Sequence, residues 1–220
     1  MLSKSRWAPA FAGMTRGLSI AVCMMLLTGC ATLDPTPVAS NPPVAQSLAT
    51  QFSLSGRFSA KTASEQVSGQ FRYTQKDAER TLNLFSPLGT PLADIFATRD
   101  SATLTQANGS TQTAASLAAL LRTVIDLPVT DTMMSAWLQG LPSTLALEVA
   151  TLKGVERDAN GLFTRFTEGG WSIEISARME AAKDGQGVQS KANAPRRMRW
   201  SLAALPDTDV RWAIDEWSTP

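Results

Sequence analysis

The sequence lacks the residues on which most hydrolases depend. It contains no histidine and only two cysteines, Cys23 and Cys30, which lie within and just after an apolar run near the N-terminus. The rest of the chain therefore cannot supply a zinc cluster of Cys and His, a Ser-His-Asp triad or a Cys-His pair. Catalysis by carboxylate, lysine or tyrosine side chains is still possible, but the sequence shows no spaced pair of acids on a common apolar face that would suggest a general acid and a general base. We expect no catalytic site, no metal site and no cofactor, and the sequence disfavours a hydrolase.

Charge of one sign is also missing. The chain has 20 Lys plus Arg against 19 Asp plus Glu. Three basic residues and no acid precede Cys30, so the remainder carries 17 basic and 19 acidic residues, a net charge of −2. No basic stripe interleaved with aromatic residues occurs, and a nucleic-acid partner is therefore not expected.

The N-terminal segment has the pattern of a secretory signal. Residues 17–27 are apolar and uncharged, follow Arg16, and are too short to span a bilayer as a helix. The run ends in Leu27-Thr28-Gly29-Cys30, which resembles a bacterial lipobox, in which the cysteine is acylated and becomes the first mature residue. We predict a lipoprotein signal peptide over 1–29, with Met14 as an alternative start because 1–13 make an unusual leader. The competing interpretation is an ordinary secretory signal followed by a chance cysteine.

After Cys30 the chain is rich in proline and has almost nothing bulky to bury. Residues 30–43 include four prolines and are predicted to be a tether. In lipoproteins with such a signal, an Asp after the cysteine is the retention signal for the inner membrane. Here the residue is Ala31, which favours the outer membrane. The 191 residues from Cys30 onward suit one domain, which we place at 44–220.

Most of that domain alternates apolar and polar residues with period two, which is typical of half-buried antiparallel strands. The first two strands, over 52–60 and 67–73, form a predicted hairpin because the link at 62–66 is short and polar. Further strands are predicted over 80–85, 92–98, 102–106, 162–167, 171–175, 198–202 and 210–214, with Asn108-Gly109 as a hairpin turn and 178–194 as a loop.

The middle of the chain predicts two amphipathic helices. Apolar residues from Leu117 to Ile125 recur at i, i+3, i+4, i+7 and i+8, with Thr113 as the predicted cap. A second, shorter stripe starts near Asp131 and ends before Gly140. Each helix must place its apolar face against something. The pattern therefore predicts a mainly β fold with a helical insertion, an open antiparallel β-barrel capped by helices.

The turn Ser86-Pro87-Leu88-Gly89-Thr90 lies between two of the predicted strands. Pro and Gly favour a turn, and Ser and Thr favour a loop. The single large apolar residue, Leu88, either folds back onto the core or is exposed for contact with something apolar. The residues alone leave this choice open.

The aromatic residues of the sequence allow two interpretations of the protein interior as well. Six Trp and eight Phe occur in the chain, mostly on the predicted strand faces. They can fill an ordinary core, or they can line a concave apolar cleft that takes acyl chains. Periodicity does not separate a lipid-anchored envelope scaffold with a solid core from a protein that binds an acyl ligand.

Five short segments occur in a characteristic order along the chain. They are Phe52-Ser53-Leu54-Ser55-Gly56-Arg57-Phe58, Ser86-Pro87-Leu88-Gly89, Leu127-Pro128-Val129, Trp137-Leu138-Gln139-Gly140-Leu141-Pro142 and Ile214-Asp215-Glu216-Trp217. Following a matching lipobox, and with the helix pair in the middle, this ordered set resembles the LolB family, the outer-membrane receptors of the bacterial lipoprotein localisation pathway.

The resemblance implies an open β-barrel capped by helices around an apolar cavity. The cavity takes the acyl chains of lipoprotein cargo from the periplasmic carrier LolA, and the cargo is then inserted into the outer membrane without enzymatic activity or a cofactor. We expect a monomer whose partners are LolA, acylated cargo and outer-membrane lipid.

Site residues follow from the same resemblance. Cys30 matches the acylated cysteine, and Leu88, flanked by Pro87 and Gly89, matches a leucine on a membrane-insertion loop. Tyr73 stands where relatives often have Trp, so its hydroxyl needs a polar partner. The candidates for the acyl cavity are Phe58, Phe71, Tyr73, Trp137, Trp171 and Trp200.

Overall fold

A computed structural model describes residues 46–63, 65–144, 152–180 and 192–219. The predicted signal peptide, the acylated Cys30 and the tether lie outside the described residues, as does most of the loop predicted over 178–194. Everything below concerns the described residues.

Strands dominate this part of the chain. They are β1 (Gln51–Lys61), β2 (Gln66–Lys76), β3 (Glu79–Phe85), β4 (Pro91–Ala97), β5 (Ala102–Gln106), β6 (Thr111–Ala114), β7 (Lys153–Arg157), β8 (Phe163–Glu168), β9 (Trp171–Arg178), β10 (Pro195–Leu202) and β11 (Leu205–Ser218). Two helices, α1 (Leu117–Ile125) and α2 (Asp131–Leu138), lie between β6 and β7 in the sequence. The mainly β class with a helical insertion is confirmed.

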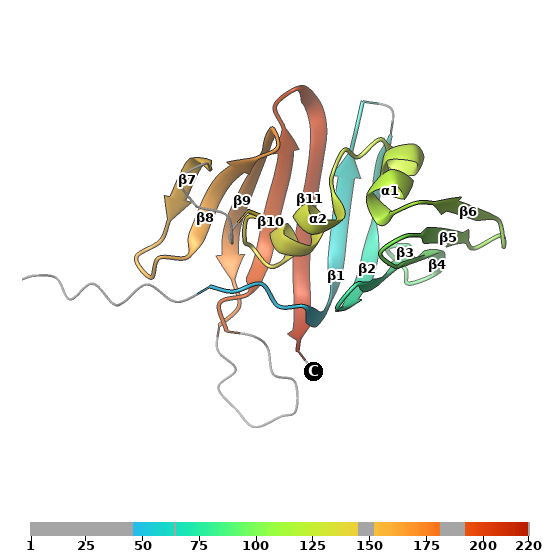
Figure 1. Cartoon of the computed structure of the whole chain (residues 1–220), viewed down its shortest axis with the longest axis horizontal. Coiled ribbons are helices and arrows are strands. Elements are labelled where there is room, and N and C mark those ends of the chain that lie inside the picture. Colours follow the sequence, from blue (N-terminus) through green and yellow to red (C-terminus); the bar gives the residue numbers. More distant parts are fainter. Residues whose placement is uncertain (1–45, 64, 145–151, 181–191, 220) are drawn as a thin grey trace, which may run out of the picture. The chain divides into compact units, whose positions relative to one another are not determined.

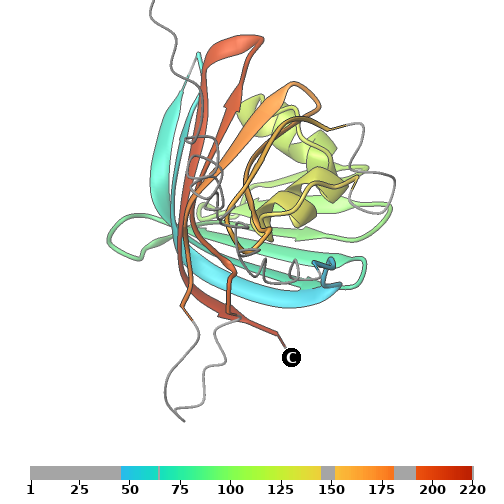
Figure 2. The ribbon, with the colours of Figure 1, turned by 90° about the vertical axis from the view of Figure 1, so that its left-hand side faces the viewer.

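All eleven strands form one antiparallel sheet (Figure 1). Its order is β6-β5-β4-β3-β2-β1-β11-β10-β9-β8-β7. The first strand, β1, and the last strand, β11, therefore pair with each other in the middle of the sheet. Within the described residues the edge strands β6 and β7 do not pair with each other, and the sheet is therefore open. Figure 2 shows that it curves around the two helices.

Local sequence explains most strand boundaries. The hairpin of β1 and β2 forms as predicted, with Thr62 and Glu65 bonded across its turn. Gly109 has φ +83 in the turn between β5 and β6, which confirms the Asn-Gly signal. Strands β6 and β7 were not predicted because their short sequences are polar and mostly exposed, and such strands show no apolar alternation.

The helices start at neighbouring polar caps. Ser116 caps α1 by accepting a hydrogen bond from the Ala119 N–H, 3.1 Å away. The prediction of Thr113 as that cap is wrong, because Thr113 pairs with Thr103 in the sheet. Thr130 caps α2 and accepts from the Met133 N–H, so the start predicted near Asp131 is confirmed. Gly140, with φ +70, follows the end of α2.

The core lies between the helices and the concave face of the sheet. Leu117, Leu120 and Leu121 of α1 are buried, as is every residue of α2 from Met134 to Leu138. The alternating faces of the strands supply the other wall. Burial of these apolar side chains is what holds two short helices that would not be stable alone.

A bulge in β11 keeps the buried side chains of β1 and β11 on the same face of the sheet on both sides of the bulge. Ser55 pairs with Glu216 but Gly56 pairs with Ile214, so Asp215 is the extra residue. Asp215 and Glu216 are both exposed, whereas Trp217 is buried. Opposite the bulge, a Cβ on Gly56 would lie 2.1 Å from the Ala213 carbonyl oxygen, which explains the glycine there.

Candidate functional site

The predicted cavity residues gather beneath the helices, where most of them form one continuous row of aromatic rings. Successive ring centroids lie 6.0 Å apart for Trp171 and Trp137, and 5.4 Å apart for Trp137 and Trp200. The row continues from Trp200 through Trp212 to Phe71 at 5.2 and 4.9 Å. These spacings are those of favourable edge-to-face and tilted aromatic pairs.

The two remaining candidates lie at the sides of this row. Phe58 is half-buried, and its ring centroid lies 6.4 Å from that of Phe71 and 6.1 Å from that of Trp212. The ring centroid of Tyr73 lies 5.5 Å from that of Phe52. The Phe52 ring in turn stacks on Trp217, with a centroid distance of 5.0 Å. The sequence prediction omitted Trp212, which joins Trp200 to Phe71 in the row, although its place in the alternation of β11 is a signal that could have identified it.

These rings leave almost no surface free. Phe71, Tyr73, Trp137, Trp171 and Trp200 are each 2% exposed or less. An acyl chain therefore finds almost no exposed ring to lie on in this conformation. The described residues therefore show a packed interior in which these rings are covered.

Two indole donors in the middle of the row have no acceptor. The Nε1 atoms of Trp200 and Trp212 are buried without a hydrogen-bond partner in the described part of the chain. At the end of the row the same groups are satisfied, because Trp137 donates to Glu168 at 2.7 Å and Trp171 donates to the Pro128 carbonyl at 3.2 Å. A buried donor without an acceptor costs stability, so such groups are uncommon and call for an explanation.

Glu168 anchors the end of α2 to the sheet. Its carboxylate accepts hydrogen bonds from Trp137 Nε1, from the Ser143 N–H and hydroxyl, and from the Thr144 N–H, at 2.6 to 3.1 Å. Burial opposes ionisation of Glu168, but these donors outweigh it and hold the pKa below its ordinary value of 4.5. The charged form of Glu168 is thus part of the folded structure.

Tyr73 finds the polar partner that the sequence requires. Its hydroxyl donates to Gln75 Oε1 at 2.9 Å, and the same oxygen accepts from the Ser135 hydroxyl of α2 at 2.7 Å. Burial raises the pKa of Tyr73 well above its ordinary value. Tyr73 is therefore a neutral hydrogen-bonding residue that links β2 to α2 through Gln75.

A second polar link joins both helices to β3. Asp131, the first residue of α2, accepts a hydrogen bond from the Ala118 N–H of α1 at 2.7 Å. Its other carboxylate oxygen lies 3.6 Å from Arg80 Nη1, and both side chains are largely buried. This single carboxylate therefore holds the start of α1, the start of α2 and the sheet together.

The turn Ser86–Thr90 presents Leu88 outward. The Leu88 side chain is 94% exposed, so it does not fold back onto the core. Ser86 closes the turn from both sides, since its carbonyl accepts from the Gly89 N–H and its hydroxyl accepts from the Thr90 N–H. Gly89 has φ +85, a conformation that glycine adopts without strain.

The turn is also fixed to the neighbouring strand. Gln70 of β2 donates from Nε2 to the Pro87 carbonyl at 3.0 Å. In Figure 2 the loop between β3 and β4 projects from the sheet on the side opposite the helices. The tip is thus a well-supported turn that carries an exposed leucine, and it lies on the other face of the sheet from the aromatic row.

Two further properties describe what this part of the chain does not contain. Neither α1 nor α2 is long and apolar enough to cross a membrane. Across residues 46–219, within the described ranges, no three His, Cys, Asp or Glu residues lie together in a way that could hold a metal ion.

Comparison with known proteins gives one consistent result. The family profile described as "Outer membrane lipoprotein LolB" matches residues 50–217. The chain is 29% identical over 209 residues to the outer-membrane lipoprotein LolB of Thiobacillus denitrificans, covering 94% of this chain and 99% of the relative. It is 32% identical over 151 residues to the LolB of Cupriavidus pinatubonensis, covering 67% and 68%, and 27% identical over 218 residues to that of Ralstonia nicotianae, covering 95% and 100%.

Proposed function

Because this chain belongs to the LolB family of outer-membrane lipoproteins, we propose that it accepts acylated lipoproteins from the periplasmic carrier LolA and inserts them into the outer membrane. The family consists of lipoprotein receptors and not of enzymes. The protein is accordingly anchored by lipid in the outer membrane. We assign the anchor to Cys30, and the proline-rich residues 30–43 give the domain the reach to meet a soluble carrier.

The acyl chains bind, in this proposal, along the aromatic row between the helices and the sheet. The helices move away from the sheet first, because the rings are buried in the described conformation. Two features support the choice of site. The row is continuous from Trp171 to Phe71, and the unpaired Nε1 donors of Trp200 and Trp212 suit the carbonyl oxygens of an acyl ester or amide.

A site that opens only when helices move also suits transfer. Burial of an acyl chain is worth roughly 0.8 kcal/mol per CH₂ in an apolar cleft as in a bilayer, so a permanently open cleft for three chains would leave little free energy to drive cargo into the membrane. The free energy needed to displace the helices makes the free energy of acyl-chain binding less favourable by the same amount. With no nucleotide or other energy source, direction comes from affinities that increase from carrier to receptor to membrane.

Leu88 then acts at the membrane step. The observation that carries this assignment is its 94% exposure on a turn that is held by its own hydrogen bonds and by Gln70. Pro87 and Gly89 shape the turn, and Leu88 contacts the acyl region of the bilayer while cargo leaves. A single leucine adds only about 2 kcal/mol of burial, so it perturbs lipid locally without anchoring the domain.

Leu88→Glu is the variant that tests this function. Cargo with labelled acyl chains is transferred from the carrier to the full, acylated receptor, and then from the receptor to liposomes. Because position 88 is far from the aromatic row, acceptance is expected to stay within about twofold, while the rate of release falls at least about tenfold. Leu205→Glu is the matched control, since Leu205 is an exposed leucine at the start of β11. Normal release from the Leu88→Glu protein would contradict the assignment.

The packed interior favours one other function, an envelope scaffold with a solid core. Native mass spectrometry of protein treated with a fluorescent fatty acid separates the two. A receptor binds the fatty acid and changes its tryptophan emission, because the acyl chain displaces ring contacts. A scaffold binds none at any concentration below that at which the fatty acid forms micelles.

A further inference from the structure

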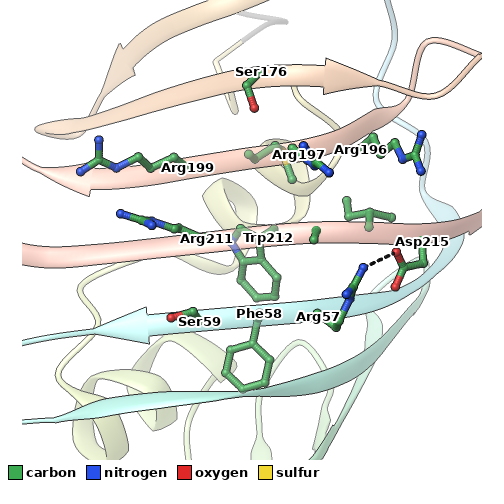
Figure 3. Close-up of a pocket in the computed structure, with 13 residues that line it drawn as sticks. Arg57, Phe58, Ser59, Ser176, Arg196, Arg197, Arg199, Arg211, Trp212 and Asp215 are labelled. Carbon is green, nitrogen blue, oxygen red and sulfur yellow. Dashed lines mark hydrogen bonds and ion pairs between the residues drawn. The ribbon is translucent and has the colours of Figure 1, made fainter. Parts of the chain in front are cut away.

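The outer face of the sheet carries a cluster of arginines that the proposed function does not use. A shallow depression of about 480 Å³ lies over β9, β10, β11 and β1 (Figure 3). Five arginine side chains line it: Arg57, Arg196, Arg197, Arg199 and Arg211. Four of them come from β10 and β11, which follow each other in the sequence, and Arg57 comes from the distant strand β1, so the fold completes the cluster through the β1–β11 pairing.

The acids around the depression neutralise only part of this charge. Asp215 lies 3.2 Å from Arg57. Asp209 is shared by Arg199 and Arg211, which lie directly opposite each other on β10 and β11. Like charges at directly opposed positions repel each other, and one carboxylate cannot fully compensate two guanidinium groups.

Arg196 and Arg197 add two exposed charges. Neither has an ion pair or a side-chain hydrogen bond in the described part of the chain. Glu174, opposite Arg199 on β9, pairs with Arg165 outside the depression. Five arginines against the two acids that pair with them leave an excess of three positive charges, although the chain from Cys30 onward is slightly acidic as a whole. An arginine fork matches phosphate geometry, and a concentrated positive patch on a neutral protein selects an anionic surface.

The depression lies near the turn that carries Leu88. Arg57 pairs across the sheet with Gln70, and Gln70 donates to the Pro87 carbonyl. Because neighbouring strands lie about 4.8 Å apart, the turn begins about two strands from Arg57. Arg57, Gln70 and the turn are all on the face opposite the helices, so the charge and the exposed leucine face the same way.

Two further apolar side chains lie on this face along β4, the strand that follows the turn. Leu92 and Phe96 of β4 are 40% and 50% exposed, whereas Ile95 and Ala97, which alternate with them, are buried. On the outer face, β4 therefore presents two exposed apolar side chains with Asp94 between them, hydrogen-bonded to Asn83, whereas β1, β11 and β10 present the arginines. Basic residues beside exposed leucine and phenylalanine are the composition of surfaces that lie on anionic membranes.

We propose that this outer face, made of the five arginines with Leu88, Leu92 and Phe96, docks the anchored domain on the phosphate headgroups of anionic lipid. This inference rests on the proposed outer-membrane function, and it specifies which face of the domain lies on the membrane. With the outer face on the membrane, the helices and the aromatic row face the periplasm, where the carrier arrives, and Leu88 points into lipid. A narrow turn with one fully exposed leucine offers little area to a protein partner but fits between lipid headgroups.

The test measures how close the outer face lies to the bilayer. The full acylated protein with Ser176→Cys is labelled with a donor fluorophore, because Ser176 is exposed beside the depression and both native cysteines are assigned to the signal or the anchor. It is reconstituted in phosphatidylcholine vesicles with or without 30% phosphatidylglycerol, with an acceptor on the lipid headgroups. Energy transfer is expected to rise with the anionic lipid and to fall as salt is added.

Arg196→Gln with Arg197→Gln removes the two unpaired charges. Each arginine near an anionic surface contributes about a fivefold change in equilibrium, so the ratio of docked to undocked protein is expected to fall about 25-fold for the pair. Arg99→Gln with Arg122→Gln is the matched control, since it removes two exposed charges elsewhere. Energy transfer that is equal on neutral and anionic vesicles, or unchanged in the Arg196/Arg197 variant, would overturn the proposal.

Two other outcomes are distinguishable. If the Arg196/Arg197 variant keeps its vesicle contact but loses binding to the carrier in solution, the patch serves a protein partner and membrane docking is wrong. If docking behaves as expected while the protein accepts no acylated cargo, the docking surface stands and the proposed receptor function fails.

Discussion

Leu88 and Trp137 are both large apolar residues in segments typical of the LolB family, but the structure uses them in opposite ways. Leu88 is 94% exposed on a turn closed by its own hydrogen bonds, whereas Trp137 is fully buried and packs on Trp171 and Trp200. A substitution at position 88 therefore tests function with little effect on folding. A substitution at position 137 changes folding and the proposed acyl site together. For Leu88→Glu we expect a free energy of unfolding within about 0.5 kcal/mol of the unsubstituted protein.

Trp137→Ala is expected to give the largest effect and so to sharpen this contrast most. It removes a fully buried ring and leaves the Glu168 carboxylate without one of its donors. The expected loss of unfolding free energy is about 4 kcal/mol, measured by urea denaturation.

Trp137→Phe separates packing from hydrogen bonding at the same position. It keeps an aromatic ring between Trp171 and Trp200 but removes the Nε1 donor, so it is expected to lose clearly less than Trp137→Ala. If Trp137→Ala were as stable as the Leu88→Glu protein, the interior would not be packed as the structure describes, and the contrast between the two regions would fail.

Glu168→Gln tests the polar part of the buried interface. The amide keeps the size of the side chain, but its NH₂ faces N–H and O–H groups that need an acceptor. We expect a loss of about 3 kcal/mol at neutral pH. Glu174→Gln on β9 is the control, because Glu174 pairs with Arg165 at a more exposed site and its loss is expected to cost less than about 1 kcal/mol.

The pH dependence of stability gives an independent check on Glu168. Its folded pKa lies below the ordinary value of 4.5, so the stabilisation is fully present above that pH and is lost as pH falls through the folded pKa. The unsubstituted protein should lose stability more steeply below about pH 4.5 than Glu168→Gln does. Parallel curves for the two proteins would show that the carboxylate is not held in its charged form.

Sequence predicted the fold best where one rule acted alone. Alternation identified nine of the eleven strands in the described ranges, and helical spacing together with Gly140 located the two helices there. Strands β6 and β7 were missed because a polar edge strand has no apolar face to show. Thr113 was misassigned as a cap because Ser116, three residues later, offers the same chemistry.

The candidate site was predictable only in part. The aromatic candidates came from the resemblance to the LolB family. Alternation in the strands and helical spacing at Trp137 place such residues on apolar faces, but periodicity could not tell a filled interior from an open one. The outer arginines were not found, since residues 57, 196, 197, 199 and 211 meet only through the β1–β11 and β10–β11 pairings. The net charge of −2 for the residues from Cys30 onward also conceals a local excess of three positive charges.

Asp131→Asn is expected to give the smallest stability change of the interface variants, and it tests where the boundary between the two regions lies. The amide oxygen still accepts from the Ala118 N–H, so only the partly buried ion pair with Arg80 is lost. We expect a cost of about 1 kcal/mol, against less than about 0.5 kcal/mol for Asp207→Asn, which loses an exposed pair with Lys61 on the sheet.

The stronger consequence of Asp131→Asn concerns motion. If the helices must leave the sheet before acyl chains bind, weakening the link to Arg80 raises the population of the open form, about fivefold for 1 kcal/mol. Amide hydrogen exchange in α1 and α2 should then become faster by that factor, and cargo acceptance should become faster with it, while Leu88-dependent release stays the same. Faster exchange without faster acceptance would mean that helix displacement does not limit loading. The interior would then behave as a structural core, and only the outer face would remain a functional surface.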